Sequence, residues 1–415
     1  MSLRRSLPGN LGAPGVYIHE VSGGSRPIVA VGTSTAGFVG ISPISKKNSA
    51  VIAADDLKAE VIDNWTGFKM RYFSAPADPA TPDPNWQEDE WTHLAHAVYG
   101  FFLNGGRRCW VVDMGNDDTA VQLEAALDVL AAIDEIAILA APGFTGDAHY
   151  AKIKDHFEKH DNQDRVFIAD APEEVVKTAV SLTQFNPTQL KTERGFTTIY
   201  VPWLQVSDPN PGKDAAGFTK PGKTVNVPPS GHVAGVWARS DATRGVHKAP
   251  ANEIVQGALG LTHTMSSQTQ EALNKNGVNA IRYFQDAGYL IWGARTLAAD
   301  QEWRYLNVRR LFNMIEESIA ESTRWVVFEP NDEMLWASIR RDVGAFLTDQ
   351  WRQGALMGST PEQAFFVKCD AENNPFDSIR RGRVIIDIGI APVLPAEFVI
   401  FRISQYEAGI DVEIA

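Results

Sequence analysis

The sequence predicts two kinds of domain in one chain: an α/β domain built on a parallel sheet, and a smaller α+β domain. Strand-like and helix-like segments alternate between residues 94 and 201, which is typical of βαβ units. After about residue 291 the pattern changes to two long amphipathic helices and several short strands. Strand-like segments also lie near both chain ends, without an adjacent partner strand.

The α/β domain is expected within residues 94–290. A helix over 95–103 comes first, and Asp118 or Thr119 can cap a second helix with apolar side chains every three or four residues. Two more helices are expected over 149–160 and 173–185, and strands over 109–112, 136–141, 166–169 and 197–201. This order predicts a sheet covered by helices on both faces.

A stretch rich in proline, glycine and lysine, residues 209–229, interrupts this rhythm. A long helix is expected after it over 253–274. Two apolar segments, 278–284 and 289–294, lie on either side of Asp286-Ala-Gly288 and predict a hairpin.

The α+β domain is expected over 291–403. Its two helices carry apolar faces, formed by Tyr305, Val308, Phe312, Ile315 and Ile319 and by Leu335, Ile339, Val343 and Phe346. Its strands are expected at 364–369, 384–390 and 398–403. The strands within residues 15–40 are expected to complete this small sheet, so residues 23–40 are grouped with it. Residues 41–93, which include a proline-rich loop, are expected to form a surface insertion.

Both chain ends are expected to act as linking arms, over residues 1–22 and 404–415. Apolar side chains alternate with polar ones there, at Val16, Ile18 and Val21 and again at Ile410, Val412 and Ile414. A period of two predicts a strand with one buried face, but so short a strand needs the edge of a sheet. A terminal segment behind glycine can find that edge on another molecule.

Composition excludes several classes of function. The 415-residue chain has a formal net charge of −13 and a pI of about 5.2, which argue against a general nucleic-acid binder. It has no apolar run of the length that spans a membrane. We expect no signal peptide, because glycine and proline follow Arg4 and Arg5. Cys109 and Cys369 are expected to be buried reduced thiols, in a chain that is cytoplasmic at synthesis.

Catalytic and cofactor sites are weakly indicated. Asp113 and Asp170 each follow a strand, but no glycine-rich phosphate loop accompanies them, so turn or helix-cap carboxylates are favoured. Ser230, His232 and Asp241 have the residue types of a hydrolase triad without a nucleophile elbow. The spacing of His156 and His160 permits a metal site, yet charged neighbours indicate a solvated helix face. We expect no catalytic residue, cofactor or metal.

Two basic clusters stand out against the acidic background. Arg340 and Arg341 lie on an expected helix opposite its apolar face, and Arg380, Arg381 and Arg383 lie beside an expected strand. They are interpreted as solvated patches or as a docking surface for an acidic partner.

The chain resembles the contractile tail sheath proteins of contractile phages, R-type pyocins and extracellular contractile injection systems. The resemblance is spread in order over most of the chain, except 41–90 and 205–225. The matching segments are Ala13–Val21, Phe101–Val112, Gly245–Asn252, Asn279–Arg282, Gly293–Leu297, Tyr305–Leu311, Phe328–Asp332, Trp351–Leu356 and Pro395–Ile400.

This resemblance implies a structural subunit that polymerises helically around an inner tube and contracts without nucleotide. It implies terminal arms that add strands to sheets of neighbouring subunits, and a C-terminal domain that faces the tube. The α/β domain would lie outside, with a subtilisin-like fold that lacks catalytic machinery. Implied partners are the subunit itself in stacked hexameric rings, the tube protein, and baseplate and terminator or cap proteins, with no nucleic-acid contact and no membrane insertion. Assembly in the bacterial cytoplasm is implied, with possible extracellular release of the particle.

Two other classes of function remain open at this point. An α/β hydrolase or nucleotide enzyme would need a phosphate loop or nucleophile elbow, which the sequence lacks. A non-contractile tube or capsid-like subunit would show a single assembly form by electron microscopy.

Overall fold

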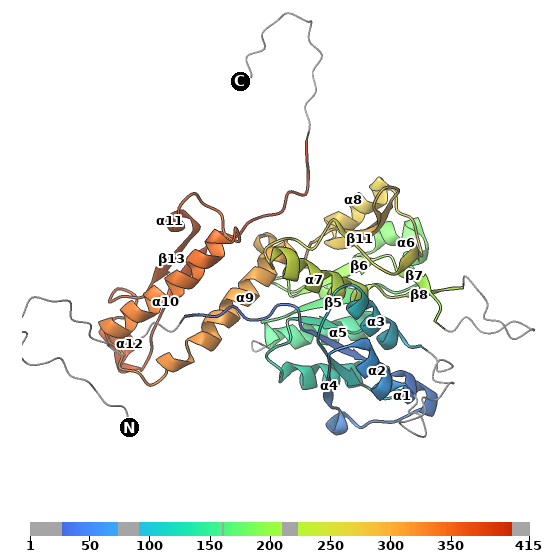
Figure 1. Ribbon diagram of the computed structural model, residues 1–415, viewed down its shortest axis with the longest axis horizontal. Coiled ribbons are helices and arrows are strands. Elements are labelled where there is room, and N and C mark those ends of the chain that lie inside the picture. Colours follow the sequence, from blue (N-terminus) through green and yellow to red (C-terminus); the bar gives the residue numbers. More distant parts are fainter. Residues whose placement is uncertain (1–26, 74–90, 160–161, 210–222, 401–415) are drawn as a thin grey trace, which may run out of the picture.

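The computed structural model describes residues 27–73, 91–159, 162–209 and 223–400. Figure 1 shows the large domain, a sheet with its helices, on the right and a smaller C-terminal domain on the left. Helix α9, Leu306–Ser322, extends from the large domain into the small one.

The large domain is an α/β domain with a nine-stranded sheet in the order β2-β3-β1-β4-β5-β6-β11-β12-β9. The strands from β3 to β11 in this order run parallel, and β2, β12 and β9 pair antiparallel at the two edges. The strand bounds are β1 Ala36–Gly40, β2 Ala59–Ile62, β3 Cys109–Asp113, β4 Ile138–Ala140, β5 Val166–Asp170, β6 Thr197–Val201, β9 Glu253–Ile254, β11 Val278–Phe284 and β12 Gly288–Trp292.

Helices cover both faces of this sheet, as the alternating pattern predicts. One buried cluster joins Phe38 to side chains of α2, α3 and α7, and the other joins Val39 to α4, α5, α6 and α8. Neighbouring strand residues therefore enter opposite cores. The bounds are α2 Trp65–Tyr72, α3 His93–Leu103, α4 Ala120–Ala131, α5 Asp147–Glu158, α6 Ala179–Gln184, α7 Ser230–Arg244 and α8 Ser267–Lys275.

Most expected elements of this domain are confirmed. The strands β3 to β6, the β11–β12 hairpin and the helices α3, α4 and α5 lie within a few residues of their expected positions. Thr119 caps α4, since its side chain accepts a hydrogen bond from the backbone N–H of Gln122. The small sheet of β10 Ala258–Leu261, β7 Leu204–Ser207 and β8 Thr224–Val227 was not expected.

Two expectations for the N-terminal third are wrong. Strand β1 does not join the C-terminal sheet but lies between β3 and β4, fully buried, because its residues supply apolar side chains to both cores. Residues 41–93 do not form only a surface insertion. They contribute helix α1, Pro43–Asn48, the edge strand β2 and helix α2, whose Phe68 is buried.

The predictions of two helices are also wrong in part. The long helix over 253–274 is replaced by β9, β10 and only then α8, with Gly257 at a φ of 84°, a conformation that a helix cannot continue through. The helix over 173–185 is broken into a 3₁₀ turn, Val175–Lys177, and α6, where Thr178 adopts an extended conformation and caps α6.

The C-terminal domain packs α9 and α10 against a two-stranded sheet. Its core includes Leu311, Ile315, Leu335, Ile339, Val343 and Phe346, which confirms the expected face of the second helix. Its other bounds are α10 Glu333–Arg352, α11 Pro361–Ala364, β13 Phe365–Lys368, α12 Phe376–Arg380 and β14 Asp387–Ile390. Further 3₁₀ turns cover Ala54–Asp56, Thr188–Leu190, Gln301–Trp303 and Arg324–Val326.

The chain before β1 lies along α9. The backbone N–H of Val31 donates to the Ser318 hydroxyl at 3.0 Å, and that of Val29 donates to Ser322 at 3.3 Å. Ile28 and Val31 also pack against the C-terminal core. Residues 27–33 thus contact the small domain, although β1 itself belongs to the large sheet.

The last expected strands differ from the structure as well. Within 384–390 only Asp387–Ile390 forms a strand. Residues 398–400, the described part of the expected strand 398–403, have no regular structure, and their side chains Phe398, Val399 and Ile400 are 72%, 70% and 82% exposed. No strand within the described chain is placed to pair with them.

Candidate assembly sites

The segment after β14 leaves the C-terminal domain and crosses to the α/β domain. The backbone N–H of Val393 still donates to the carbonyl of Ala355, at 3.2 Å, within the small domain. The carbonyl of Val393 accepts from the side-chain amide of Asn307 at 3.0 Å. That amide also donates to the carbonyl of His247 at 2.8 Å, so Asn307 joins the departing segment to the loop after α7.

Glu397 fixes the same segment by a dense set of hydrogen bonds. Its Oε1 accepts from Arg295 Nε at 2.9 Å and from Asn274 at 3.1 Å, and its Oε2 accepts from Arg295 Nη2 at 2.6 Å and from Tyr305 at 3.4 Å. The Arg295 and Glu397 side chains are 13% and 22% exposed. Burial alone would raise the pKa of Glu397, but the hydrogen bonds and charge of Arg295 and the bond from Asn274 lower it overall.

Arg295 is itself held rigidly on the large sheet. Its N–H donates to the Asn279 side chain at 2.7 Å, and its carbonyl accepts from the Asn279 amide at 2.8 Å and from the Thr198 hydroxyl at 2.8 Å. A Cβ atom at Gly293 would come within 2.7 Å of the Asn279 Oδ1. Glycine at 293 therefore permits the close approach that positions Arg295.

The sheet of the C-terminal domain is a second candidate assembly site. Among the described residues it contains only β13 and β14, paired antiparallel from Phe365 with Ile390 to Lys368 with Asp387. Two strands make a marginal sheet, and an edge strand offers backbone groups with which a further strand can pair. Phe366 on β13 is 58% exposed.

The expected linking-arm residues Val16, Ile18, Val21, Ile410, Val412 and Ile414 lie outside the described residues, so their pairing stays a prediction.

The five arginines of the basic clusters all lie in the C-terminal domain, but they differ in their surroundings. Arg340 is half-buried and donates to the carbonyl of Cys369. Arg341 is exposed beside the Asp342 carboxylate, at 3.0 Å. Arg380, Arg381 and Arg383 are exposed, and Arg381 pairs with Asp377 at 2.7 Å.

The triad-like residues are not assembled into a triad. The hydroxyl of Ser230, at the start of α7, donates to Asp170 Oδ2 at 2.7 Å, and its N–H donates to Oδ1 at 2.9 Å. His232 faces Gly100 of α3, and burial first, then the charge of His96, lowers its pKa to about 3. Asp241 binds Arg310 instead. The two nearby groups, Ser230 and Asp170, are both buried.

The remaining polar candidates also have structural partners. Asp113 accepts hydrogen bonds from Ser42 and Ser45 at the start of α1 and from the Gly115 N–H, which fits the turn-carboxylate interpretation. His156 is buried rather than on a solvated face, and burial, then Arg165, lowers its pKa to about 4. His160 lies outside the described residues. Cys109 and Cys369 are both buried and free, as expected.

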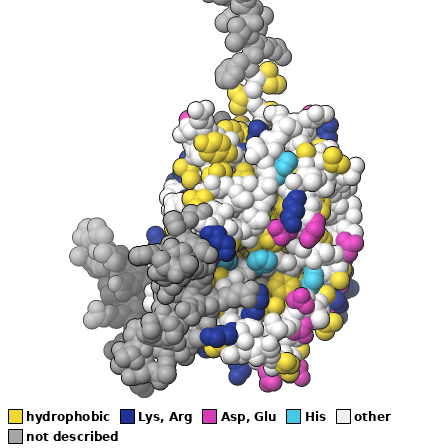
Figure 2. All heavy atoms as spheres, turned by 90° about the vertical axis from the view of Figure 1, so that its right-hand side faces the viewer, with side chains coloured by type: hydrophobic (Ala, Val, Ile, Leu, Met, Phe, Trp, Pro, Cys, Tyr) yellow, Lys and Arg dark blue, Asp and Glu magenta, His cyan; other side chains and the backbone are white. Residues whose placement is uncertain are grey.

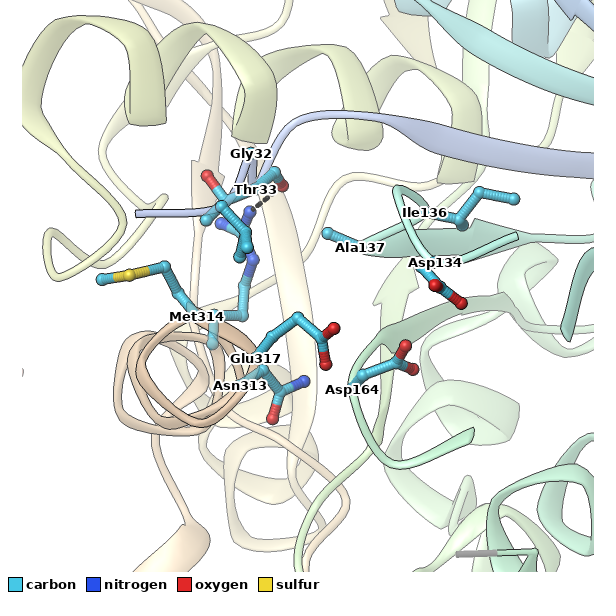
Figure 3. Close-up of a pocket in the computed structure, with 11 residues that line it drawn as sticks. Gly32, Thr33, Asp134, Ile136, Ala137, Asp164, Asn313, Met314 and Glu317 are labelled. Carbon is cyan, nitrogen blue, oxygen red and sulfur yellow. Dashed lines mark hydrogen bonds between the residues drawn. The ribbon is translucent and has the colours of Figure 1, made fainter. Parts of the chain in front are cut away.

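A small cleft lies where α9 meets the large domain, beside the residues that precede β1 and β4. Figure 3 shows the carboxylates of Glu317 and Asp164 turned toward one another, with Asp134 nearby. Burial first, then these neighbouring carboxylates, raise the pKa of Glu317. In the described ranges, no group of three His, Cys, Asp or Glu side chains could hold a metal ion.

Figure 2 shows basic and acidic side chains interspersed over the α/β domain on the face opposite the C-terminal domain. None of the described helices is both long and apolar enough to cross a bilayer.

The sequence patterns did not single out Asn274, Asn279, Arg295, Asn307 or Glu397 as functional residues. All but Asn274 lie in segments that carry the family resemblance, and the fold brings those segments together around residues 393–397. Their meeting depends on contacts between residues up to 123 positions apart in the chain, which no local period can signal.

Comparison with known proteins identifies two matching family models. The model described as phage tail sheath protein central domain matches residues 119–297, and the model of the phage tail sheath C-terminal domain matches residues 298–405. Together they span more than half of the chain.

Individual proteins similar to this chain are also named as tail sheath proteins. A protein of Pseudomonas aeruginosa (strain UCBPP-PA14), named as a putative prophage major tail sheath protein, is 27% identical over 182 residues, which are 43% of this chain and 46% of that protein. The tail sheath protein of Vibrio phage KVP40 is 29% identical over 42% of this chain and 26% of its own length. The aligned part thus spans less than half of each of these relatives.

Solved structures match nearly the whole chain. A chain of the sheath complex of an extracellular contractile injection system, PVC, in the contracted state, is 27% identical with a TM-score of 0.73, over 96% of this chain and 99% of that one. A chain in the baseplate structure of the anti-feeding prophage (AFP) is 28% identical with a TM-score of 0.72, over 95% and 99%.

Proposed function

This chain belongs to the phage tail sheath family, and we propose that it is the structural subunit of a contractile sheath. It would polymerise helically around an inner tube and contract to drive the tube through a target envelope. The observation that carries this proposal is the two-stranded β13–β14 sheet, which needs further strands, in a chain whose similar structures include a contracted sheath complex.

We infer that the missing strands come from the terminal arms of neighbouring subunits. Strand-like segments lie within these arms, at residues 15–21 and 410–414, and strand addition satisfies exposed backbone groups on both partners. Each hydrogen bond contributes only about 0.5–1.5 kcal/mol. A helical assembly repeats the hydrogen bonds of the added strand in every subunit. Their total contribution to the free energy of assembly is therefore large, although each single contact is weak.

Deletion of residues 408–415 tests this proposal. The truncated chain should stay a folded, soluble monomer by circular dichroism and light scattering, but it should form no sheaths in electron micrographs. Normal sheath assembly by the truncated chain would contradict strand exchange. Micrographs of the intact assembly also separate a contractile sheath, with long and short forms of different diameter, from a non-contractile tube with one form.

The tube is proposed to contact the C-terminal domain through its arginines. Exposed charge pairs are individually worth about 0–1 kcal/mol and re-form easily, which suits a surface that must slide. Arg341, Arg380, Arg381 and Arg383 are the exposed members, whereas Arg340 is engaged by the Cys369 carbonyl and is expected to contribute less.

Charge reversal tests this contact. Arg341→Glu with Arg383→Glu should weaken co-sedimentation with the tube protein, most strongly at low salt, where screening is least. Arg352→Glu, at the exposed end of α10, is the matched control and should have little effect. Equal tube binding by all three proteins would exclude these arginines as the contact.

A structural role without catalysis accounts for the polar residues of the α/β domain, since Ser230 and Asp241 are engaged by Asp170 and Arg310. We propose that this domain is the outer, subtilisin-like but non-catalytic part of the sheath. The further proposed partners are baseplate and terminator or cap proteins, with subunits in stacked hexameric rings. Assembly would take place in the bacterial cytoplasm, in a phage tail or a related particle.

A further inference from the structure

The path of the chain from β14 to the C-terminal arm passes over both domains. Residues 387–390 pair with β13, residues 391–393 still contact the small domain, and Glu397 is bound to the large domain through Arg295. Phe398, Val399 and Ile400 follow directly and are mostly exposed. Glu397 is therefore the last described residue that the subunit body holds by its side chain.

Strand β14 and Glu397, two of the attachments along this path, are held in different ways. Strand β14 is held by the ladder of a two-stranded sheet, and a strand pulled from its end loses such bonds one at a time. Glu397 is held by a forked, charge-assisted pair that must break as a unit. Asn279 fixes the backbone of Arg295 on both sides, so this pair is mounted on the core of the large sheet.

We propose that the Arg295–Glu397 pair is a latch that transmits tension from the C-terminal arm to the α/β domain and shields β14 from it. The inference rests on the proposed sheath function, in which a neighbouring subunit pulls on the arm. Without the latch, the pull would act on the end of β14 and open the sheet to which incoming arms are proposed to bind. Asn307 holds Val393 as a second, neutral contact on the same path.

Single-molecule pulling of the isolated full-length subunit tests the latch without requiring a sheath. One handle is attached through Val121→Cys, which lies on the α/β domain at a position 69% exposed, while Cys109 and Cys369 are buried. The other handle is attached to the C-terminus. In the native subunit, residues 387–397 should be released only after a distinct first rupture, with an extension of up to about 40 Å at 3.6 Å per residue.

The variant Glu397→Gln keeps the shape of the side chain and removes its charge. It should lose the first rupture, so that β14 opens at a clearly lower force. Arg295→Lys, which keeps the charge but not the fork, should lower the rupture force too, and it replaces the first variant if that one does not fold. Asp377→Asn removes an exposed pair in α12 and should leave the trace unchanged.

Equal first-rupture forces in the native protein and in Glu397→Gln would overturn the proposed latch. The proposal would also fail if Asp377→Asn lost the first rupture as Glu397→Gln does. Sheath formation by the intact chain is scored separately by electron microscopy. If no sheath forms but the latch is present, the proposed function fails alone; if sheaths form and the rupture is unaffected by Glu397→Gln, the latch fails alone.

Discussion

Replacement of Asp241 by alanine is expected to destabilise the junction between the two domains severely. Asp241 of α7 accepts from Arg310 of α9 at 3.0 and 2.5 Å and from the Thr33 hydroxyl at 2.6 Å. Arg310 also donates to the Thr33 carbonyl at 3.0 Å and lies 4.7 Å from the ring centre of Trp237. The pair thus joins α7, α9 and the segment before β1.

The expected magnitude follows from burial. The Arg310 and Asp241 side chains are only 3% and 4% exposed, so Asp241→Ala leaves a buried guanidinium without its counter-charge. Breaking such a pair from one side costs about 3–5 kcal/mol, a large part of a typical total of about 5–15 kcal/mol. With a urea dependence of about 3 kcal/mol per molar, the unfolding midpoint should fall by about 1–1.7 M.

Equilibrium urea unfolding, followed by fluorescence and by circular dichroism, measures this change. Asp349→Ala, which removes an exposed pair with Arg352, is the control and should alter stability by less than about 0.5 kcal/mol. Asp241→Ala combined with Arg310→Met removes both charges and should recover part of the loss. A midpoint for Asp241→Ala no lower than that of the control would refute the role assigned to the pair.

Two further predictions concern single positions in the large domain. Burial raises the pKa of Asp170 to about 7 despite hydrogen bonds from Ser230 and Gly143, so the folded state binds its proton more tightly than the unfolded state. The free energy of unfolding should therefore fall as pH rises from about 4 to 7, by up to about 1.4 kcal/mol per pH unit. Asp170→Asn should remove this pH dependence, measured by urea unfolding at each pH. The same pH dependence in both proteins would contradict the raised pKa of Asp170. Gly293→Ala should cost about 1–3 kcal/mol through its clash with Asn279, whereas Gly344→Ala in α10, with open space around it, should be neutral or stabilising.

The sequence was informative where structure is local. The strands β3 to β6 and the helices between them follow each other within short distances, so periodicity and caps such as Thr119 locate them. The apolar face of α10 is likewise visible at a spacing of three and four residues. The two long helices expected after residue 291 are present as α9 and α10.

The sequence was less informative where distant segments meet. The apolar residues 36–40 would suit any buried strand, and only packing between β3 and β4 decides their sheet. The helical pattern assigned to 253–274 ignored Gly257 and Gly260, at which the chain turns and β10 forms. Residues 398–400 look like a strand because they are apolar and two of them are β-branched, but no described strand pairs with them.

The ion pairs Arg310–Asp241 and Arg295–Glu397 have a common consequence for movement of the sheath. Arg310 joins the large domain to α9 and to residue 33, and Arg295 joins it to the segment leaving β14. Because specific, buried polar contacts break abruptly and not by gradual sliding, they favour one relative placement of the two domains. We therefore expect each subunit to move largely as one body, with the changes during contraction concentrated at contacts between subunits and in the chain beyond Glu397.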